Sequence, residues 1–231
     1  MAAAADQLKR VQLNLGNKTA QIVFADADLQ AATTAAVGSA FPGQACSAIS
    51  RVILHHSVRD EFIALLKEKA QATGPSMLIE RAAVERVERY IETGNAQGDL
   101  LFGGQRPSGD EYAQGCYFEP TAFAFDDQSN PVCRDEIFGP VISILGFDSD
   151  EEALTLANDT EYGLLASLWT QDAKRQRYCI RRLEMGIVTV NSASQLSHQA
   201  PWGGFKQSGI GRRYGDMGLA PFVEHKTVWV R

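Results

Sequence analysis

The stretch Ala20-Gln21-Ile22-Val23-Phe24-Ala25-Asp26-Ala27-Asp28-Leu29 predicts the end of a β-strand followed at once by the start of a helix. Its first five residues form a short apolar run with β-branched members, which is typical of a buried strand. Asp26 and Asp28 can accept hydrogen bonds from the free N–H groups at a helix N-terminus, so both are predicted to cap an alanine-rich helix over 29–40. A strand that passes directly into a helix is the basic unit of an α/β fold.

The same alternation continues along the chain. A polar, glycine-rich segment over 103–117 predicts a surface loop. Strands are predicted over 51–55, 99–102, 141–147, 164–170, 186–191 and 226–230, and helices from about 57 or 60 to 72 and over 81–93, 149–158 and 172–184. Strands that alternate with helices predict an α/β fold: a three-layer domain with a mostly parallel sheet.

Composition excludes several classes of protein. The chain has 231 residues, of which 45% are hydrophobic and 22% charged, so a folded globular domain is expected rather than a disordered chain. The formal net charge is −6 and no long run has one sign, which argues against a nucleic-acid partner. The apolar runs are too short to span a membrane. The N-terminus has no basic region followed by an apolar one, so no secretory signal is predicted.

Four cysteines, at 46, 116, 133 and 179, are widely spaced. No CxxC pair occurs, so neither a metal site nor a disulfide framework is expected, and reduced thiols in the cytoplasm are predicted. Cys46 follows Gly43-Gln44-Ala45, and backbone N–H groups around such a turn can activate a thiol and stabilise an oxyanion. The alternative for each cysteine is a packing role, which is expected for Cys116, Cys133 and Cys179.

Several segments, in the same order along the chain, resemble motifs of the aldehyde dehydrogenase superfamily. Gly43-Gln44-Ala45-Cys46 matches the family's G-Q-x-C, which carries the catalytic thiol, and Glu136-Ile137-Phe138-Gly139-Pro140-Val141 matches E-I-F-G-P-V. The segment 201–209, Pro-Trp-Gly-Gly-Phe-Lys-Gln-Ser-Gly, matches P-x-G-G-x-K-x-S-G. Residues 8–18 resemble L-K-R-V-x-L-E-L-G-G-K, and residues 224–228 resemble the closing T-E-x-K-T-V.

The resemblance implies a catalytic domain over 1–220 that transfers acyl groups through sulfur. The Cys46 thiolate would attack an aldehyde, hydride would leave to NAD(P), and a thioester would remain for water or coenzyme A. The Cys46 backbone N–H would line the oxyanion hole, while Glu136 and Phe138 would hold the nicotinamide ribose and flank the ring. Residues 221–231 would form an oligomerisation strand that pairs with a neighbouring subunit, giving a homodimer or a higher homo-oligomer. Lys18 would be a structural lysine.

Departures from the family pattern change these expectations. The family's general-base glutamate falls at Asn14, and because an amide takes no proton from water, thioester hydrolysis is expected to lose about 10²–10⁴-fold. A second glutamate that often follows G-R is Arg213. The chain also begins where the family's cofactor-binding half ends and has no GxGxxG pattern, so weak NAD(P) binding and impaired dehydrogenase activity are expected of it alone. His198 is a candidate base or substrate contact.

Two alternatives remain open at this point. A thiolate attacks esters without NAD, so the chain could be a stand-alone cysteine-dependent esterase for short acyl groups. A non-catalytic remnant or interaction module would keep the fold and lose the chemistry. The fate of an acyl group placed on Cys46 distinguishes the three hypotheses.

Overall fold

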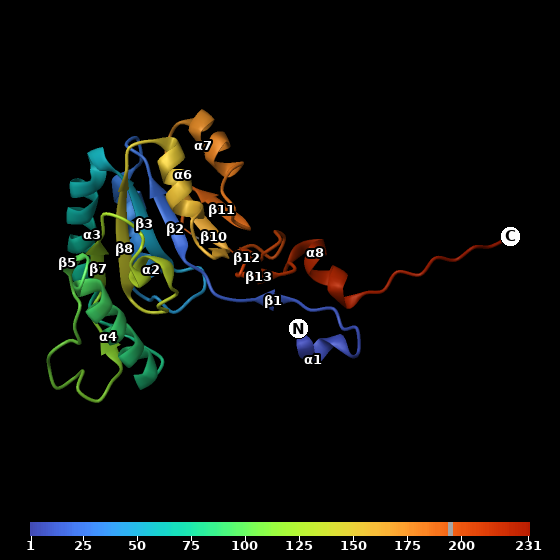
Figure 1. Ribbon diagram of the computed structural model, residues 1–231, viewed down its shortest axis with the longest axis horizontal. Coiled ribbons are helices and arrows are strands. Elements are labelled where there is room, and N and C mark those ends of the chain that lie inside the picture. The colour runs from blue at the N-terminus through green and yellow to red at the C-terminus, as the bar shows by residue number, and fades with distance from the viewer. Residues whose placement is uncertain (194–195) are drawn as a thin grey trace.

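The computed structural model describes residues 1–193 and 196–231, and a seven-stranded sheet forms its centre (Figure 1). Every neighbouring pair in this sheet is parallel except β5 and β7, which are antiparallel. The α/β class with a mostly parallel sheet is therefore confirmed. In spatial order the strands are β11 (Ile187–Val190), β10 (Leu165–Trp169), β2 (Thr19–Val23), β3 (Ile49–His55), β8 (Val141–Phe147), β7 (Thr121–Ala124) and β5 (Asp99–Phe102).

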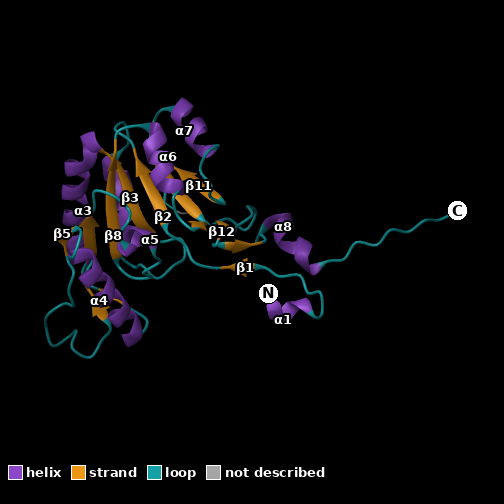
Figure 2. Ribbon diagram, in the orientation of Figure 1, coloured by secondary structure: helices purple, strands orange, loops and turns teal. Residues whose placement is uncertain are grey.

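Helices cover both faces of the sheet and give the three layers (Figure 2). Alternate residues of β8 point to opposite faces, because side chains alternate along a strand. Ile142 and Ile144 pack in a core cluster with α2 and α3, whereas Leu145 and Phe147 pack in the clusters that contain residues of α4, α6 and α7. The bounds are α2 (Leu29–Ala40), α3 (Arg59–Thr73), α4 (Arg81–Asn95), α6 (Asp150–Asn158) and α7 (Ala173–Ile180).

Two predicted features of the helices need correction. The helix predicted over 172–184 ends at Ile180, and residues 181 and 182 form a turn. Asp28 caps α2 as predicted, by accepting a hydrogen bond from the Ala31 N–H at 3.0 Å. Asp26 does not cap this helix: it accepts hydrogen bonds from the Thr170 hydroxyl and from the N–H groups of residues 171 and 172. Asp26 therefore ties the end of β2 to the turn between β10 and α7.

Short elements outside the sheet join a segment near the N-terminus to one near the C-terminus. Strand β1 (Leu13–Asn14) pairs antiparallel with β13 (Gly209–Ile210), and Arg10 forms an ion pair with Glu224 at 2.7 Å. The other short elements are α1 (Ala2–Ala5), η1 (His56–Val58), β4 (Ser76–Met77), β6 (Tyr117–Phe118), α5 (Pro131–Arg134), β9 (Tyr162–Gly163), β12 (Phe205–Lys206), α8 (Gly215–Leu219) and η2 (Ala220–Phe222).

The segment after η2 extends away from the rest of the chain (Figure 1). Residues 223–231 form neither helix nor strand, so the strand predicted over 226–230 does not form within this chain. Trp229 is 92% exposed. The loop predicted over 103–117 is present, and β6 begins at its last residue. Within the described ranges, no helix combines the length and the apolar character needed to cross a membrane.

Candidate active site

The segment 43–48 links the end of α2 to β3, and a backbone hydrogen bond and the Gln44 side chain fix its course. Cys46 lies in a tight turn closed by a hydrogen bond from the Ala48 N–H to the Ala45 carbonyl at 2.9 Å. The Gln44 amide donates to the Met77 carbonyl at 2.9 Å and accepts from the Ile79 N–H at 2.7 Å. The Cys46 thiol is half-buried and free, and its backbone N–H has no acceptor among the described residues. Both groups are therefore available to a substrate.

Gly43 brings this segment into contact with the segment 136–141. Its φ is +60°, a conformation that residues with a side chain rarely adopt. A Cβ atom at this position would lie 2.5 Å from the Gly139 carbonyl carbon, so the two backbones leave no room for a side chain. Two motifs that are far apart in the sequence therefore meet at a glycine–glycine contact, and this contact places Glu136 and Phe138 near Cys46.

Cys46, Glu136 and Phe138 line the same narrow crevice, and Asn17 also lines it. The Asn17 N–H donates to Glu136 Oε1 at 3.0 Å, which fixes the orientation of the carboxylate. Burial raises the pKa of Glu136 above its ordinary value, against smaller opposing effects of this N–H and of the Lys18 and Arg86 cations. The structure thus brings together three of the four residues predicted for the site.

Ser208 joins the segment 13–18 to the segment 201–209. Its buried hydroxyl donates to the Gly16 carbonyl at 2.7 Å and accepts from the Gly163 N–H at 2.9 Å. The Asn17 side chain accepts a further hydrogen bond from the Leu164 N–H at 3.3 Å. No role was predicted for Ser208 or Asn17 from the sequence. The only available signal was their place inside recognisable motifs, since their partners lie far away in the sequence.

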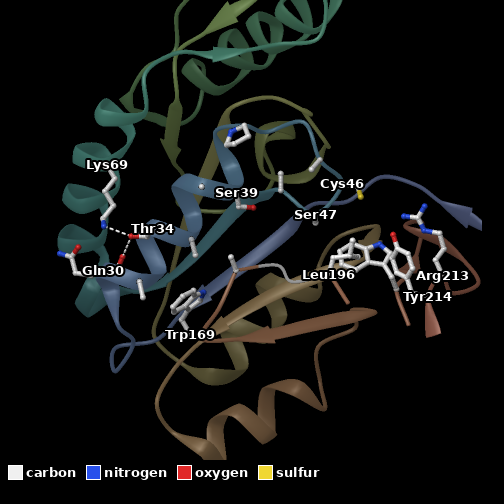
Figure 3. A pocket seen from close by; sticks show the side chains of 18 residues that line it. Gln30, Thr34, Ser39, Cys46, Ser47, Lys69, Trp169, Leu196, Arg213 and Tyr214 are labelled. Atoms are coloured by element: carbon white, nitrogen blue, oxygen red, sulfur yellow. Dashed lines mark hydrogen bonds between the residues drawn. The ribbon is translucent and has the colours of Figure 1, made fainter. Parts of the chain in front are cut away.

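A wide cleft of about 1040 Å³ also borders Cys46 (Figure 3). Its walls include the aromatic side chains of Trp169, Trp202 and Tyr214. Cys46 and Tyr214 both pack against a small core cluster that contains Trp202. Because Cys46 lines both the crevice and the cleft, it stands where the two hollows meet.

Two other candidates lie outside this cleft. Asn14 is exposed in β1, opposite Gly209, and lines neither the cleft nor the crevice. His198 packs edge-to-face on Tyr214, with 5.6 Å between ring centroids, and lines a separate hollow on which Tyr214 also borders. Neither side chain is therefore brought to Cys46 by the described part of the chain.

The remaining ionisable groups are mostly structural. Burial raises the pKa of Cys133 and of Cys179 to about 11, so both thiols stay protonated at neutral pH, as expected of packing residues. Burial lowers the pKa of Lys18 to about 7, and its Nζ has no hydrogen-bond partner among the described residues. Within residues 1–193 and 196–231, no group of three His, Cys, Asp or Glu side chains is arranged to hold a metal ion.

Comparison with known proteins identifies the family to which these motifs belong. The sequence model of the Aldehyde dehydrogenase family matches residues 1–228. The chain is 38% identical to betaine aldehyde dehydrogenase of Bacillus subtilis strain 168 over 244 residues, which cover 99% of this chain and 49% of that protein. It is 42% identical to PuuC, an NADP/NAD-dependent aldehyde dehydrogenase of Escherichia coli K12, over 99% of this chain and 48% of that protein.

A solved structure shares the fold. The betaine aldehyde dehydrogenase of Staphylococcus aureus in complex with NAD+ superposes with a TM-score of 0.92 at 33% identity, over 95% of this chain and 46% of that one. This chain spans about half the length of the curated relatives that it matches. The family match over 1–228 and the identity to its members show that the chain belongs to the aldehyde dehydrogenase family.

Proposed function

We propose that this chain carries the acyl-transfer centre of an aldehyde dehydrogenase, an oxidoreductase, with Cys46 as the nucleophile. The position of Cys46 between the wide cleft and the crevice of Glu136 and Phe138 supports this proposal. A carbonyl compound entering from the cleft meets the thiol of Cys46, which also borders the crevice of Glu136 and Phe138. Family membership independently favours an aldehyde as the carbonyl compound.

The first step is addition of sulfur to the carbonyl group. The Cys46 thiolate forms a bond to the carbonyl carbon, and the π electrons move to the oxygen, which becomes an oxyanion. The Cys46 backbone N–H, which has no acceptor among the described residues, donates a hydrogen bond to that oxygen. The turn that fixes this N–H is formed before the substrate arrives, so its orientation requires no rearrangement during the reaction.

Glu136 and Phe138 are the residues that we propose for NAD(P). Glu136 Oε1 is occupied by the Asn17 N–H, while Oε2 has no hydrogen bond among the described residues and can accept from a ribose hydroxyl. The half-buried Phe138 ring lines the same crevice and offers an apolar face. The crevice encloses only about 10 Å³ in this structure, so it would have to open before Glu136 and Phe138 could hold a nicotinamide riboside; NAD(P) would then supply a hydride acceptor. Known relatives are named as NADP/NAD-dependent or were solved with NAD+.

Release of the acyl group is the step that we expect to be slow. The general-base position is Asn14, which is exposed and outside the cleft, and the second family glutamate is replaced by Arg213. Among the described residues, no Asp or Glu lines the cleft next to Cys46. Glu136, in the crevice, is the residue that we propose for NAD(P), so without another carboxylate on the cleft side to take a proton from water we expect hydrolysis of the thioester to lose about 10²–10⁴-fold.

A cysteine-dependent esterase is the second candidate function. The cleft of about 1040 Å³ admits a short acyl ester directly to Cys46, and attack on an ester expels an alcohol or phenol and needs no hydride acceptor. The same sulfur and the same oxyanion donor would serve both reactions. A non-catalytic interaction role is the third alternative, and it predicts no acylation of Cys46.

We also propose that residues 221–231 form a separate segment that adds as a strand to a neighbouring copy of the chain. Val228, Trp229 and Val230 are 70%, 92% and 89% exposed, and they lie in a segment that forms no strand within the chain. Strand addition would cover these side chains and give a homo-oligomer. A single-chain mass by light scattering would contradict this.

The four free cysteines also favour a reducing compartment, and we assign the chain to the cytoplasm.

Time-resolved hydrolysis of p-nitrophenyl acetate tests the proposed function. We expect a burst of about one equivalent of p-nitrophenol followed by slow turnover, with the acetyl group located on Cys46 by mass spectrometry. Cys46→Ala should abolish the burst, while Cys116→Ala, which removes another half-buried thiol, should retain it. Rapid steady turnover that needs Cys46 would support the esterase. No Cys46-dependent release from the folded protein would contradict both enzymatic functions.

A further inference from the structure

The charges that line the cleft have the opposite sign to the protein as a whole. The chain carries a net charge of −6, yet the charged side chains on the described walls of the cleft are both cations, Lys69 and Arg213. The charged side chains that a substrate in this cleft would contact are therefore both positive, in a protein that is acidic as a whole.

The two cations lie at opposite ends of the cleft (Figure 3). Lys69 donates a hydrogen bond to the Thr34 hydroxyl at 2.8 Å, far from the thiol in this view. Arg213 lies at the end that holds Cys46 and Tyr214. Arg213 is therefore the cation that a group bound to Cys46 would meet.

The backbone of Arg213 is fixed, while its guanidinium remains free of carboxylates. Arg213 and Trp202 exchange two backbone hydrogen bonds of 2.7 Å, which hold Arg213 beside the aromatic wall. Its guanidinium carbon lies 5.7 Å from the centroid of the Tyr214 ring. Among the described residues, no Asp or Glu forms an ion pair with Arg213. Its five N–H donors are thus available to a carboxylate, which an arginine can bind with two parallel hydrogen bonds.

We propose that Arg213 is a specificity residue that selects acyl groups carrying a carboxylate at the far end of a short chain. The substrate class is ω-carboxylated aldehydes, together with the corresponding half-esters. The inference rests on the proposed role of Cys46 and names the substrate class of that same site. The carbonyl carbon lies at the thiol, the methylene groups lie against Trp202 and Tyr214, and the carboxylate meets the Arg213 guanidinium.

Two esters of equal chain length test this inference. Mono-4-nitrophenyl glutarate ends in a carboxylate, and 4-nitrophenyl pentanoate ends in a methyl group. The second-order rate constant for the burst is measured for each ester at low ionic strength. Because Arg213 is exposed, we expect wild-type protein to favour the glutarate by about 5- to 10-fold, with the difference in the binding constant rather than in the maximal acylation rate. Added salt should reduce the ratio.

Variants locate the effect. Arg213→Gln should bring the ratio near one, and Arg213→Glu should reverse it in favour of the pentanoate. Lys69→Gln removes the other cation of the cleft and should keep most of the wild-type ratio, since Lys69 lies at the far end. Equal rate constants for the two esters in wild-type protein would overturn the inference, and so would an equal loss of preference in Lys69→Gln.

The outcomes separate this inference from the proposed function. If neither ester acylates Cys46 in the folded protein, both the proposed function and this inference are wrong. If both esters acylate Cys46 at the same rate, the nucleophile is established and only the role of Arg213 is wrong.

Discussion

The central sheet and the loops that carry the site are held together by different interactions. The strands β2, β3, β8 and β10 are buried on both faces, and their backbones pair in register along most of their length. The site loops, which we define as residues 13–18, 43–48, 136–140 and 201–214, contact each other through glycines and side-chain-to-backbone hydrogen bonds. The fold and the site geometry should therefore respond to different substitutions.

Gly43→Ala should have the largest effect of the substitutions considered, because it should disturb both the stability of the chain and the geometry of the site. The added Cβ needs space that the Gly139 backbone fills, and φ of +60° is unfavourable for alanine, so the free energy of unfolding should fall by about 1–3 kcal/mol. Displacement of the thiol by about 1 Å should slow acylation of Cys46 by about 100-fold. Urea unfolding and the ester burst measure the two effects.

The matched control is Gly38→Ala, in the last turn of α2. A Cβ at Gly38 meets nothing within 4 Å, and alanine favours a helix over glycine by about 1 kcal/mol. This variant should unfold at equal or higher urea concentration. An unchanged acylation rate in Gly43→Ala would show that the glycine contact does not position Cys46.

Lys18 lies where the two regions meet, and it makes stability depend on pH. In the folded chain burial lowers its pKa to about 7, whereas in the unfolded chain the pKa is 10.5. Between pH 7 and 9 the unfolded state binds the extra proton, so the free energy of unfolding should rise with pH, by up to about 1.4 kcal/mol per pH unit. Above pH 9 the buried thiols of Cys133 and Cys179 oppose this rise.

Urea unfolding at a series of pH values measures the slope. Lys18→Met should remove the rise between pH 7 and 9, and Lys67→Met, at an exposed position of α3, should leave it in place. The same slope in wild-type protein and in Lys18→Met would mean that another group is responsible.

Ser208→Ala should lower the free energy of unfolding by the smallest amount, because it removes only hydrogen bonds that hold the site loops. The variant leaves the buried Gly163 N–H without its acceptor and removes the bond to the Gly16 carbonyl, at a cost of about 1–2 kcal/mol. Ser197→Ala, at an exposed position, should change the free energy of unfolding by less than about 0.5 kcal/mol. Identical urea midpoints for the two variants would show that Ser208 does not hold the loops together.

Elements of the fold could be predicted from the sequence where buried positions give a periodic pattern of apolar residues. The strand over 141–147 and the helix over 29–40 match the observed bounds because apolar side chains and a capping aspartate mark them locally. Strand β7 was missed because it has only four residues and directly follows Pro120. The bonds of Asp26 to the 170–172 turn were also missed, because that turn lies far away in the sequence.

The site could be predicted only as separate motifs. Resemblance to the family selected Cys46, Glu136 and Phe138, and the structure places them in one crevice. Nothing local in the sequence shows that Gly43 contacts Gly139, or that Asn17 orients Glu136. The positive charge on the cleft walls could not be predicted from the sequence either, because Lys69 belongs to α3 and Arg213 to a loop far away in the chain.

The order of strands in the sheet limits which strand pairings can form while the chain is still being synthesised. Strand β2 pairs with β3 on one side and with β10 on the other. Ala20 can therefore pair with β3 early in synthesis, but its partner in β10, Ala166, is synthesised much later. During synthesis the first half of the sheet therefore has an open, apolar edge until β10 has left the ribosome. Pairings between such distant residues form slowly, because a long loop must close first. We expect this edge to be the surface that a chaperone protects in the nascent chain.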